Sequence, residues 1–225
     1  MMARRYEAYK TAVVKPFFRD HFARLDRQIV LVDALQAFNA GPAAVRDLKA
    51  SLESILTCFR PGRTGWLTSI LTRRIDRILI AATKADHLNH ADHDRLEAIL
   101  KHLLASAIER AQDAGASVDV LAIAAVRATR EAEVVHEGNR LEAVLGTPLP
   151  GEMMDGKTFD GKTEVAAFPG DLPNDPRAIT EAAPDRPLPL QFIRFRPPPL
   201  ERTAEGLKLS LPHIRLDRAL DFLIG

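Results

Sequence analysis

Hydrophobic and polar positions follow two different patterns along the chain. Up to about Arg130, short apolar runs are separated by stretches in which apolar residues recur every three to four positions, the spacing of a helix with one buried face. Beyond Arg130 the apolar runs alternate with polar positions, and Gly- and Pro-rich turns interrupt them, which favours antiparallel hairpins. We therefore expect an α/β domain over residues 1–130 and a β-hairpin-rich extension over residues 131–225, packed on it.

Three apolar runs in the first part predict the strands of one parallel sheet. They cover Gln28–Leu35, Arg77–Thr83 and Val118–Val126, and continuous apolar runs are typical of strands that are covered on both faces. Helical stretches separate them, which predicts a β-α-β-α-β pattern with right-handed crossovers. The helices are expected at Arg4–Leu25 with a kink at Pro16, from Gly41-Pro42 to Phe59, at Trp66–Leu71, and from His90 to Gln112, where Gly115 closes the last one.

The second part is expected to hold short antiparallel strands and one final helix. Strand-like runs cover Leu141–Leu145, Thr163–Phe168 and Gln191–Arg196, and helical periodicity returns from Ile214 to Ile224. The acidic, Pro-rich interval Asp171–Pro189 is expected to be a surface loop, since little in it would offset the entropy lost on ordering.

Composition narrows the classes of function. The chain has 225 residues, 46% of them hydrophobic, which is enough to bury a core. Its 31 basic and 30 acidic residues nearly cancel, so it lacks the charge typical of a nucleic-acid-binding protein. The single cysteine, Cys58, excludes an internal disulfide, and no apolar run approaches the roughly 20 residues of a membrane helix. Because no apolar signal segment follows Met1, we expect a cytoplasmic protein with neither a nucleic-acid partner nor a membrane span.

The most informative short segment is Thr83-Lys84-Ala85-Asp86, directly after the second predicted strand. An aspartate can accept two hydrogen bonds from the N1 and N2 donors of guanine, which adenine does not offer, while the lysine stem lies along the ring face. The segment occupies the carboxyl end of a strand, where doubly wound sheets bind ligands. The alternative is that Lys84 and Asp86 form a salt bridge or a cap within a βα loop.

Several longer segments resemble the YcjX family of predicted bacterial P-loop GTP-binding proteins. The segments are Tyr9-Lys10 with Pro16 to Phe22, Ile29 to Gln36, Ala81 to His87, Val126 to Thr129, Phe159 to Gly161, Phe168 to Pro173 and Pro212 to Asp217. The resemblance extends over nearly the whole chain and corresponds to the carboxyl-terminal half of the family's length. It implies a partial P-loop-NTPase-like sheet, whose phosphate-binding loop and switch regions would lie upstream of Met1.

The resemblance implies guanine nucleotide, GTP or GDP, as the ligand. Thr83, Lys84 and Asp86 match the base-specificity motif, with Thr83 in the place of the usual Asn; its hydroxyl can still hold the loop by hydrogen bonds. The run Ala125, Val126 and Arg127 falls at the last nucleotide-contacting loop, where a backbone N–H would meet guanine O6 and Arg127 would cover the base.

Catalysis is expected to be weaker than binding. Phosphoryl transfer needs phosphate-binding donors, a metal ion and a water-orienting group, and the resemblance would place these upstream. We therefore assign no catalytic residue and no metal ligand, and expect neither Mg²⁺ binding nor appreciable hydrolysis from this chain alone.

The strand around Ile29–Leu35 carries a second expectation. Without the strand of the phosphate loop beside it, this strand would form the edge of the sheet, and an apolar edge invites pairing with another chain. We expect self-association, recruitment of a protein partner, or poor solubility. Two alternatives to the nucleotide interpretation stay open: a non-nucleotide interaction or scaffold fragment or truncated gene product, and an enzyme assembled from two chains.

Two segments imitate a phosphate-binding loop. Gly151–Thr158 and Gly156–Thr163 both match Gly, four residues and Gly-Lys-Thr. A working loop leaves a strand and opens a helix, so that backbone N–H groups converge on phosphate. The residues that follow these segments predict a hairpin, and we interpret both matches as hairpin turns.

Other polar residues have structural interpretations. His87, His90 and His93, with Asp92 and Asp94 between them, have a spacing that suggests a metal cluster. A solvated helix start, with Asn89 and the aspartates as caps, explains the segment better. Asp33 is interpreted as a structural aspartate that caps the loop before Gly41-Pro42.

Overall fold

A three-stranded parallel sheet forms the centre of the protein. The computed structural model describes residues 2–14, 16, 26–58, 75–136, 138–182, 188–200, 202–204, 206–207 and 211–225. The strands β1 (Arg27–Val32), β2 (Arg77–Ala82) and β3 (Ser117–Ala122) lie in the order β1-β2-β3, and Arg27 pairs with Arg77, which pairs with Ser117. The predicted parallel sheet is confirmed.

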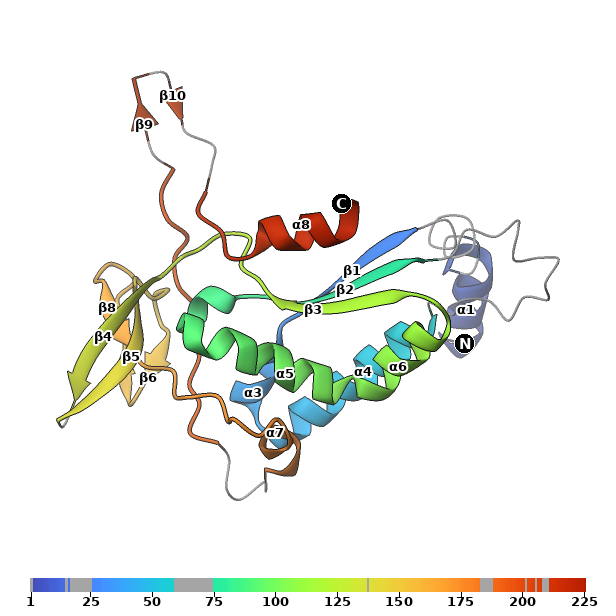
Figure 1. The fold of residues 1–225 in the computed structure, drawn as a ribbon, viewed down its shortest axis with the longest axis horizontal. Helices are drawn as coiled ribbons and strands as arrows, with labels where there is room; N and C mark the ends of the chain where they lie inside the picture. Colours follow the sequence, from blue (N-terminus) through green and yellow to red (C-terminus); the bar gives the residue numbers. More distant parts are fainter. Residues whose placement is uncertain are drawn as a thin grey trace.

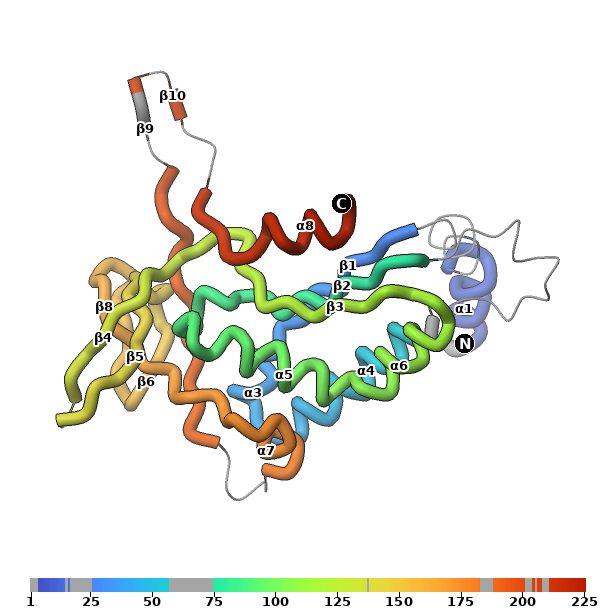
Figure 2. Tube along the Cα trace, viewed as in Figure 1, coloured from blue at the N-terminus to red at the C-terminus, as the bar shows by residue number. Residues whose placement is uncertain are grey.

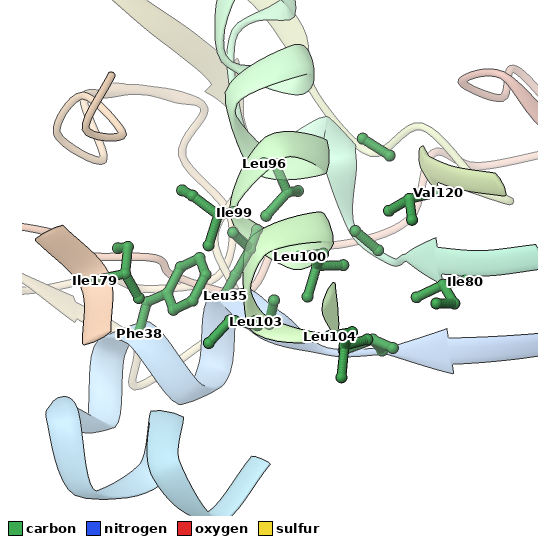
Figure 3. Close-up of a cluster of buried hydrophobic side chains, with 14 of the residues drawn as sticks. Leu35, Phe38, Ile80, Leu96, Ile99, Leu100, Leu103, Leu104, Val120 and Ile179 are labelled. Carbon is green, nitrogen blue, oxygen red and sulfur yellow. The ribbon is translucent and has the colours of Figure 1, made fainter. Parts of the chain in front are cut away.

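Helices cover both faces of this sheet (Figure 1). One face carries α3 (Ala34–Ala40), α4 (Pro42–Cys58), α5 (His93–Leu103) and α6 (Ala105–Asp113), and the other carries α8 (Leu216–Ile224). Alternate strand residues point to opposite faces, so Val30, Ile80 and Val120 join the main core under α5, whereas Leu79 and Leu121 pack with α8. Figure 3 shows the main core, where side chains of α3, α5 and α7 meet those of the strands.

Several element boundaries differ from the prediction. The first strand ends at Val32 rather than Leu35, because Asp33 Oδ1 accepts a hydrogen bond from Gln36 N at 3.3 Å and starts α3. The helix predicted from His90 to Gln112 consists of a short turn, η4 (His90–Asp92), then α5 and α6, which are separated at Leu104. Another short turn, η3 (Ala85–His87), follows β2.

The second part of the chain contains two of the three predicted antiparallel strands, at Leu141–Leu145 and within Thr163–Phe168. A sheet of order β4-β5-β8 is formed by β4 (Arg130–His136), β5 (Asn139–Gly146) and β8 (Val165–Ala167). Two small hairpins accompany it, β6 (Met153–Met154) with β7 (Lys157–Thr158) and β9 (Arg202–Thr203) with β10 (Gly206–Leu207). In the trace of Figure 2, the β9–β10 hairpin projects away from the rest of the molecule, and the chain then returns to the parallel sheet as α8.

Two predictions in this part are wrong. The interval Asp171–Pro189 is not only a surface loop, because it includes a helix, α7 (Arg177–Glu181). Leu172, before this helix, and Ile179, within it, are each 2% exposed and belong to the main core. Their burial helps to order the described part of this interval. The run Gln191–Arg196 forms only an isolated bridge from Phe195 to Pro148.

The first helix can be compared only in part. It begins as α1 (Met2–Tyr9) and continues as a wider turn, η1 (Lys10–Val14). Apart from Pro16, the rest of the helix predicted to Leu25 lies outside the described residues, as does the short helix predicted at Trp66–Leu71. Within the described ranges, no helix has the length and apolar character needed to cross a bilayer.

Candidate functional site

The loop that follows β2 is held at the carboxyl edge of the parallel sheet. Thr83 donates two hydrogen bonds to the carbonyl oxygen of Val32, from its backbone N at 2.9 Å and from its hydroxyl at 3.2 Å. The hydroxyl of Thr83 therefore joins the ends of β1 and β2, as the sequence predicted for a threonine in this place. Lys84 follows with φ of 64°, in the left-handed region that non-glycine residues seldom adopt.

Lys84 makes an ion pair with the residue that ends β1. Its Nζ lies 2.5 Å from Asp33 Oδ2, and both side chains remain partly exposed, at 40% and 31%. The other oxygen of Asp33 caps α3, so the structural interpretation of this aspartate is correct but incomplete. The ion pair holds the lysine side chain across the ends of β1 and β2.

Asp86 joins the loops that follow β2 and β3. The residue is 4% exposed, its Oδ2 accepts a hydrogen bond from Ala128 N at 2.8 Å, and its carbonyl oxygen accepts one from the Thr129 hydroxyl. An ionised carboxylate has about four acceptor positions, and no donor among the described residues bonds Oδ1. The carboxylate thus has capacity for further donors, while its position is fixed.

The residues predicted in the second loop directly precede Ala128, which bonds this aspartate, and only some of their backbone N–H groups have acceptors. Arg127 N donates to Pro212 O at 2.7 Å, and the Arg127 guanidinium bonds Thr129 O and Glu131. The N–H groups of Ala125 and Val126 have no acceptor within the described part of the chain. The contacts of Ala128 and Thr129 with Asp86 were missed by the sequence reasoning.

Two buried histidines, His87 within the loop and His93 on α5, help to hold the loop in place. His93 Nε2 lies 2.8 Å from the carbonyl oxygen of Ala85 and donates to it, and the ring of His87 meets Phe195 edge-on with a centroid separation of 5.4 Å. Burial lowers the pKa of both histidines below the ordinary value, since a buried imidazolium loses its hydration. The loop therefore rests on neutral imidazoles.

These lowered pKa values predict a loss of stability in weak acid. The unfolded chain binds more protons than the folded chain once the pH falls through the ordinary histidine pKa of 6.5, so the free energy of unfolding decreases from there down to the folded pKa. We expect a lower midpoint of thermal unfolding at about pH 5.5 than at about pH 7.5, as followed by circular dichroism. His93→Gln, which can keep a donor toward Ala85, is expected to flatten this dependence; an unchanged pH profile in that variant would assign the effect to other groups.

The first Gly-Lys-Thr segment forms a hairpin turn, as predicted, and the second forms a turn in the loop between β7 and β8, which do not pair with each other. Asp155 and Gly156 both have positive φ in the turn between β6 and β7. In the second segment, Asp160 Oδ1 accepts hydrogen bonds from the backbone N of Lys162 and Thr163 at 2.8 and 2.9 Å, which lowers the pKa of Asp160 to about 2. Those N–H groups already bind a carboxylate and are not free to bind phosphate.

The histidine and aspartate residues near α5 bond in different directions. His90 Nδ1 lies 2.8 Å from Glu131, Asp92 accepts from Arg95 at 2.6 Å, and Asp94 accepts from Arg215 at 2.9 Å. Within the described ranges, no group of three or more metal-binding side chains is assembled. Asn89 caps the short turn before α5 through Ala91 N, as predicted.

Comparison with known proteins gives a consistent result. A model of the YcjX-like family matches residues 1–225. The chain is 33% identical over 225 residues to a protein of Shewanella oneidensis named Ras-like GTPase YcjX, and 36% identical to a protein of Escherichia coli K12 with the same name. All of the chain is covered in both comparisons, but it spans only 43% and 44% of the lengths of these relatives. The chain belongs to the YcjX-like family.

Proposed function

We propose that this chain forms the guanine-recognition part of a Ras-like GTP-binding protein. In this proposal the Asp86 carboxylate accepts from guanine N1 and N2, Lys84 lies along the base, and Ala125 N or Val126 N donates to O6. Residues 1–130 would form the nucleotide-binding unit and residues 131–225 an extension packed on it. The names of the two relatives support guanine nucleotide as the ligand class.

One observation carries the proposal: a nearly buried aspartate at the carboxyl edge of a parallel sheet is fixed by the neighbouring loop. Asp86 is bonded through Oδ2 to Ala128 N, which orients the carboxylate without using all of its acceptor positions. Fixed acceptors bind a ligand at a lower entropic cost than mobile ones. The ion pair of Lys84 with Asp33 limits the motion of the lysine in the same way.

We expect little GTP hydrolysis from this chain alone. The residues of the site supply acceptors for the base, but of the two segments that match a phosphate-loop pattern, one forms the β6–β7 hairpin and the other ends in a turn between β7 and β8. Phosphoryl transfer depends on positioned phosphate donors and a metal ion, so in this proposal base binding and hydrolysis are separable properties.

Exchange of Asp86 for asparagine tests base recognition. The amide oxygen of the new side chain can keep the bond from Ala128 N, but its NH₂ group would face the N–H groups of guanine and match the O2 acceptor of xanthine. We expect Asp86→Asn to weaken the binding of fluorescent GDP by about 10-fold to 100-fold, and to favour XDP over GDP, since the loss of one charge-assisted hydrogen bond costs about 1.5–3 kcal/mol. Fluorescence anisotropy measures both ligands.

Asp113→Asn provides the matched control. This exposed residue ends α6, which leads to the start of β3 at the opposite edge of the sheet, and the substitution makes the same change in charge and shape. It is expected to leave GDP binding unchanged. Equal affinity of wild type and Asp86→Asn for GDP and for XDP would refute the proposed base contact.

A second candidate function, protein interaction through β1, is favoured by exposed apolar side chains. Ile29 and Leu31 are 40% and 62% exposed, although they share a sheet face with Leu79 and Ala81, which are buried beneath α8. Among the described strands, β1 pairs only with β2. We propose that this strand and its apolar face pair with a second copy of the chain.

Leu31→Lys tests this pairing. A lysine on an edge strand disfavours association, and the side chain is exposed enough to be replaced without a cavity. We expect the wild-type protein to show a concentration-dependent increase in mass by light scattering, and Leu31→Lys to remain monomeric at about 10-fold higher concentration. A monomeric wild type would exclude self-association through β1.

A further inference from the structure

A basic cavity lies between the loop after β3 and the hairpin-rich part of the chain. Its volume is about 790 Å³, within the size range of small-molecule sites. Its wall is formed by the segment 127–130, the end of β5, the turn at 162–164 and the extended segment 196–199, with Pro212. The loop after β3, which bonds Asp86, therefore forms one wall of the cavity.

Four cationic side chains and one anionic side chain line the cavity. Arg130 bonds both oxygens of Glu164 at 2.9 and 3.0 Å, and Arg127 pairs with Glu131. The other two cations, Lys162 and Arg196, have no carboxylate within ion-pair distance among the described residues. Arg196 instead donates through Nη1 to the carbonyl oxygen of Gly161 at 2.9 Å, which keeps its guanidinium at the wall.

The remaining wall is apolar. Three consecutive prolines, Pro197–Pro199, follow Arg196 along the cavity, and Leu145 and Pro212 add further apolar surface. Proline has no backbone N–H, so this side offers packing surface without donors. A ligand that fits the cavity would therefore join a compact anionic group to an apolar body.

We propose that this cavity binds a small organic phosphate monoester. A phosphate monoester carries a charge of about −1.5 to −2 at pH 7, which matches the two cations that have no carboxylate partner among the described residues. Guanidinium groups bind phosphate oxygens through paired donors, and an ammonium adds a point charge. The apolar part of the ligand lies on the prolines.

The cavity shares its wall at residues 127–129 with the proposed guanine site, but its two cations without a carboxylate partner belong to other segments. Lys162 and Arg196 do not take part in base recognition, and the Asp86 carboxylate does not line the cavity. A ligand without a purine base consequently tests the cavity alone.

Titration calorimetry with phenyl phosphate tests the proposal on the full chain. We expect saturable 1:1 binding, weaker binding of inorganic phosphate, which lacks the apolar part, and weaker binding of benzoate, which carries one charge. Lys162→Ala is expected to reduce the affinity for phenyl phosphate by about 10-fold, and Lys162→Arg to retain it within about 3-fold. Glu164→Gln should strengthen binding, because it removes the carboxylate of the wall and releases Arg130.

Two control variants separate specific from general effects. Lys157→Ala removes an exposed lysine of β7 that does not line the cavity and should leave the affinity unchanged. Asp86→Asn should also leave phenyl phosphate binding unchanged, so failure of the guanine site and failure of this site are distinguishable. Absence of saturable binding by both phenyl phosphate and inorganic phosphate at about 1 mM, or equal affinity in Lys162→Ala and wild type, would overturn the proposal.

Discussion

Leu100→Ala is expected to lower the free energy of unfolding by about 2–5 kcal/mol, the range for a buried leucine that leaves a cavity. The Leu100 side chain is fully buried and projects from α5 into the main core between the helices and the sheet (Figure 3). The same helix carries His93, which holds the carbonyl of Ala85, and Glu97, which accepts from Ala122 N at the end of β3. A loosened α5 should therefore weaken the guanine site as well as the fold.

Leu220→Ala gives the same chemical change on an exposed helix position. Leu220 lies on α8 and is 49% exposed, so its replacement is expected to cost less than about 1 kcal/mol. Urea unfolding of both variants, followed by circular dichroism, measures the difference. Equal losses of unfolding free energy in the two variants would contradict this expectation, because they would mean that Leu220 is packed as tightly as Leu100.

The parallel sheet could be predicted because its information is local. Each strand is a continuous apolar run, and each helix has its own apolar period and its own start or stop residues, such as Gly41-Pro42, where α3 ends and α4 begins. The predicted ends of strands and helices were less accurate where one side chain determines the end. Asp33 ends β1 by capping α3, and the apolar character of Ala34 and Leu35 gives no sign of that change, because both residues are buried in the helix as well.

The burial of apolar residues within 171–182 and 188–192 could not be predicted, because their partners are distant in sequence. Leu172 and Ile179 enter the core through contacts with helices of the first part. Asn39 and Phe192 exchange two hydrogen bonds, at 2.6 and 2.8 Å, across a separation of 153 residues. The acidic residues predict an exposed segment, and Asp171, Asp175 and Glu181 are indeed exposed. The few apolar residues of the segment nevertheless pack into the main core.

The same limit applies to the candidate site. The motif Thr83-Lys84-Ala85-Asp86 has a recognisable spacing and a predictable place after a strand. The pairing of Lys84 with Asp33 joins residues 51 positions apart, and the support of Asp86 by Ala128 and Thr129 depends on how two loops meet. Lys84 does form a salt bridge, but with Asp33 rather than within its own loop, and Asp86 bonds the loop after β3 instead of capping the turn. These contacts orient the side chains that the nucleotide proposal uses.

Gly170→Ala is expected to destabilise the protein by about 3 kcal/mol or more, because a strained backbone and a steric overlap add to each other. Gly170 has φ of +86°, and a Cβ added there would lie 2.3 Å from the carbonyl oxygen of Pro189. The left-handed conformation alone costs an L-residue about 1–2 kcal/mol, and the overlap with a backbone atom forces a further shift. That shift would displace the segment in which Gln191 N donates to Pro169 O at 2.9 Å, next to the Phe192 bonds that fix α3.

Gly156→Ala separates the two contributions. Gly156 has a similar φ of +74°, but a Cβ there meets no atom within 4 Å, so only the conformational cost of about 1–2 kcal/mol applies. Urea unfolding should rank Gly170→Ala as clearly less stable than Gly156→Ala, with both less stable than the wild type. If the two variants lose equal stability, the segment at Pro189 can move at little cost, and the close packing of 169–172 against 188–192 is not what holds the extension to the helices.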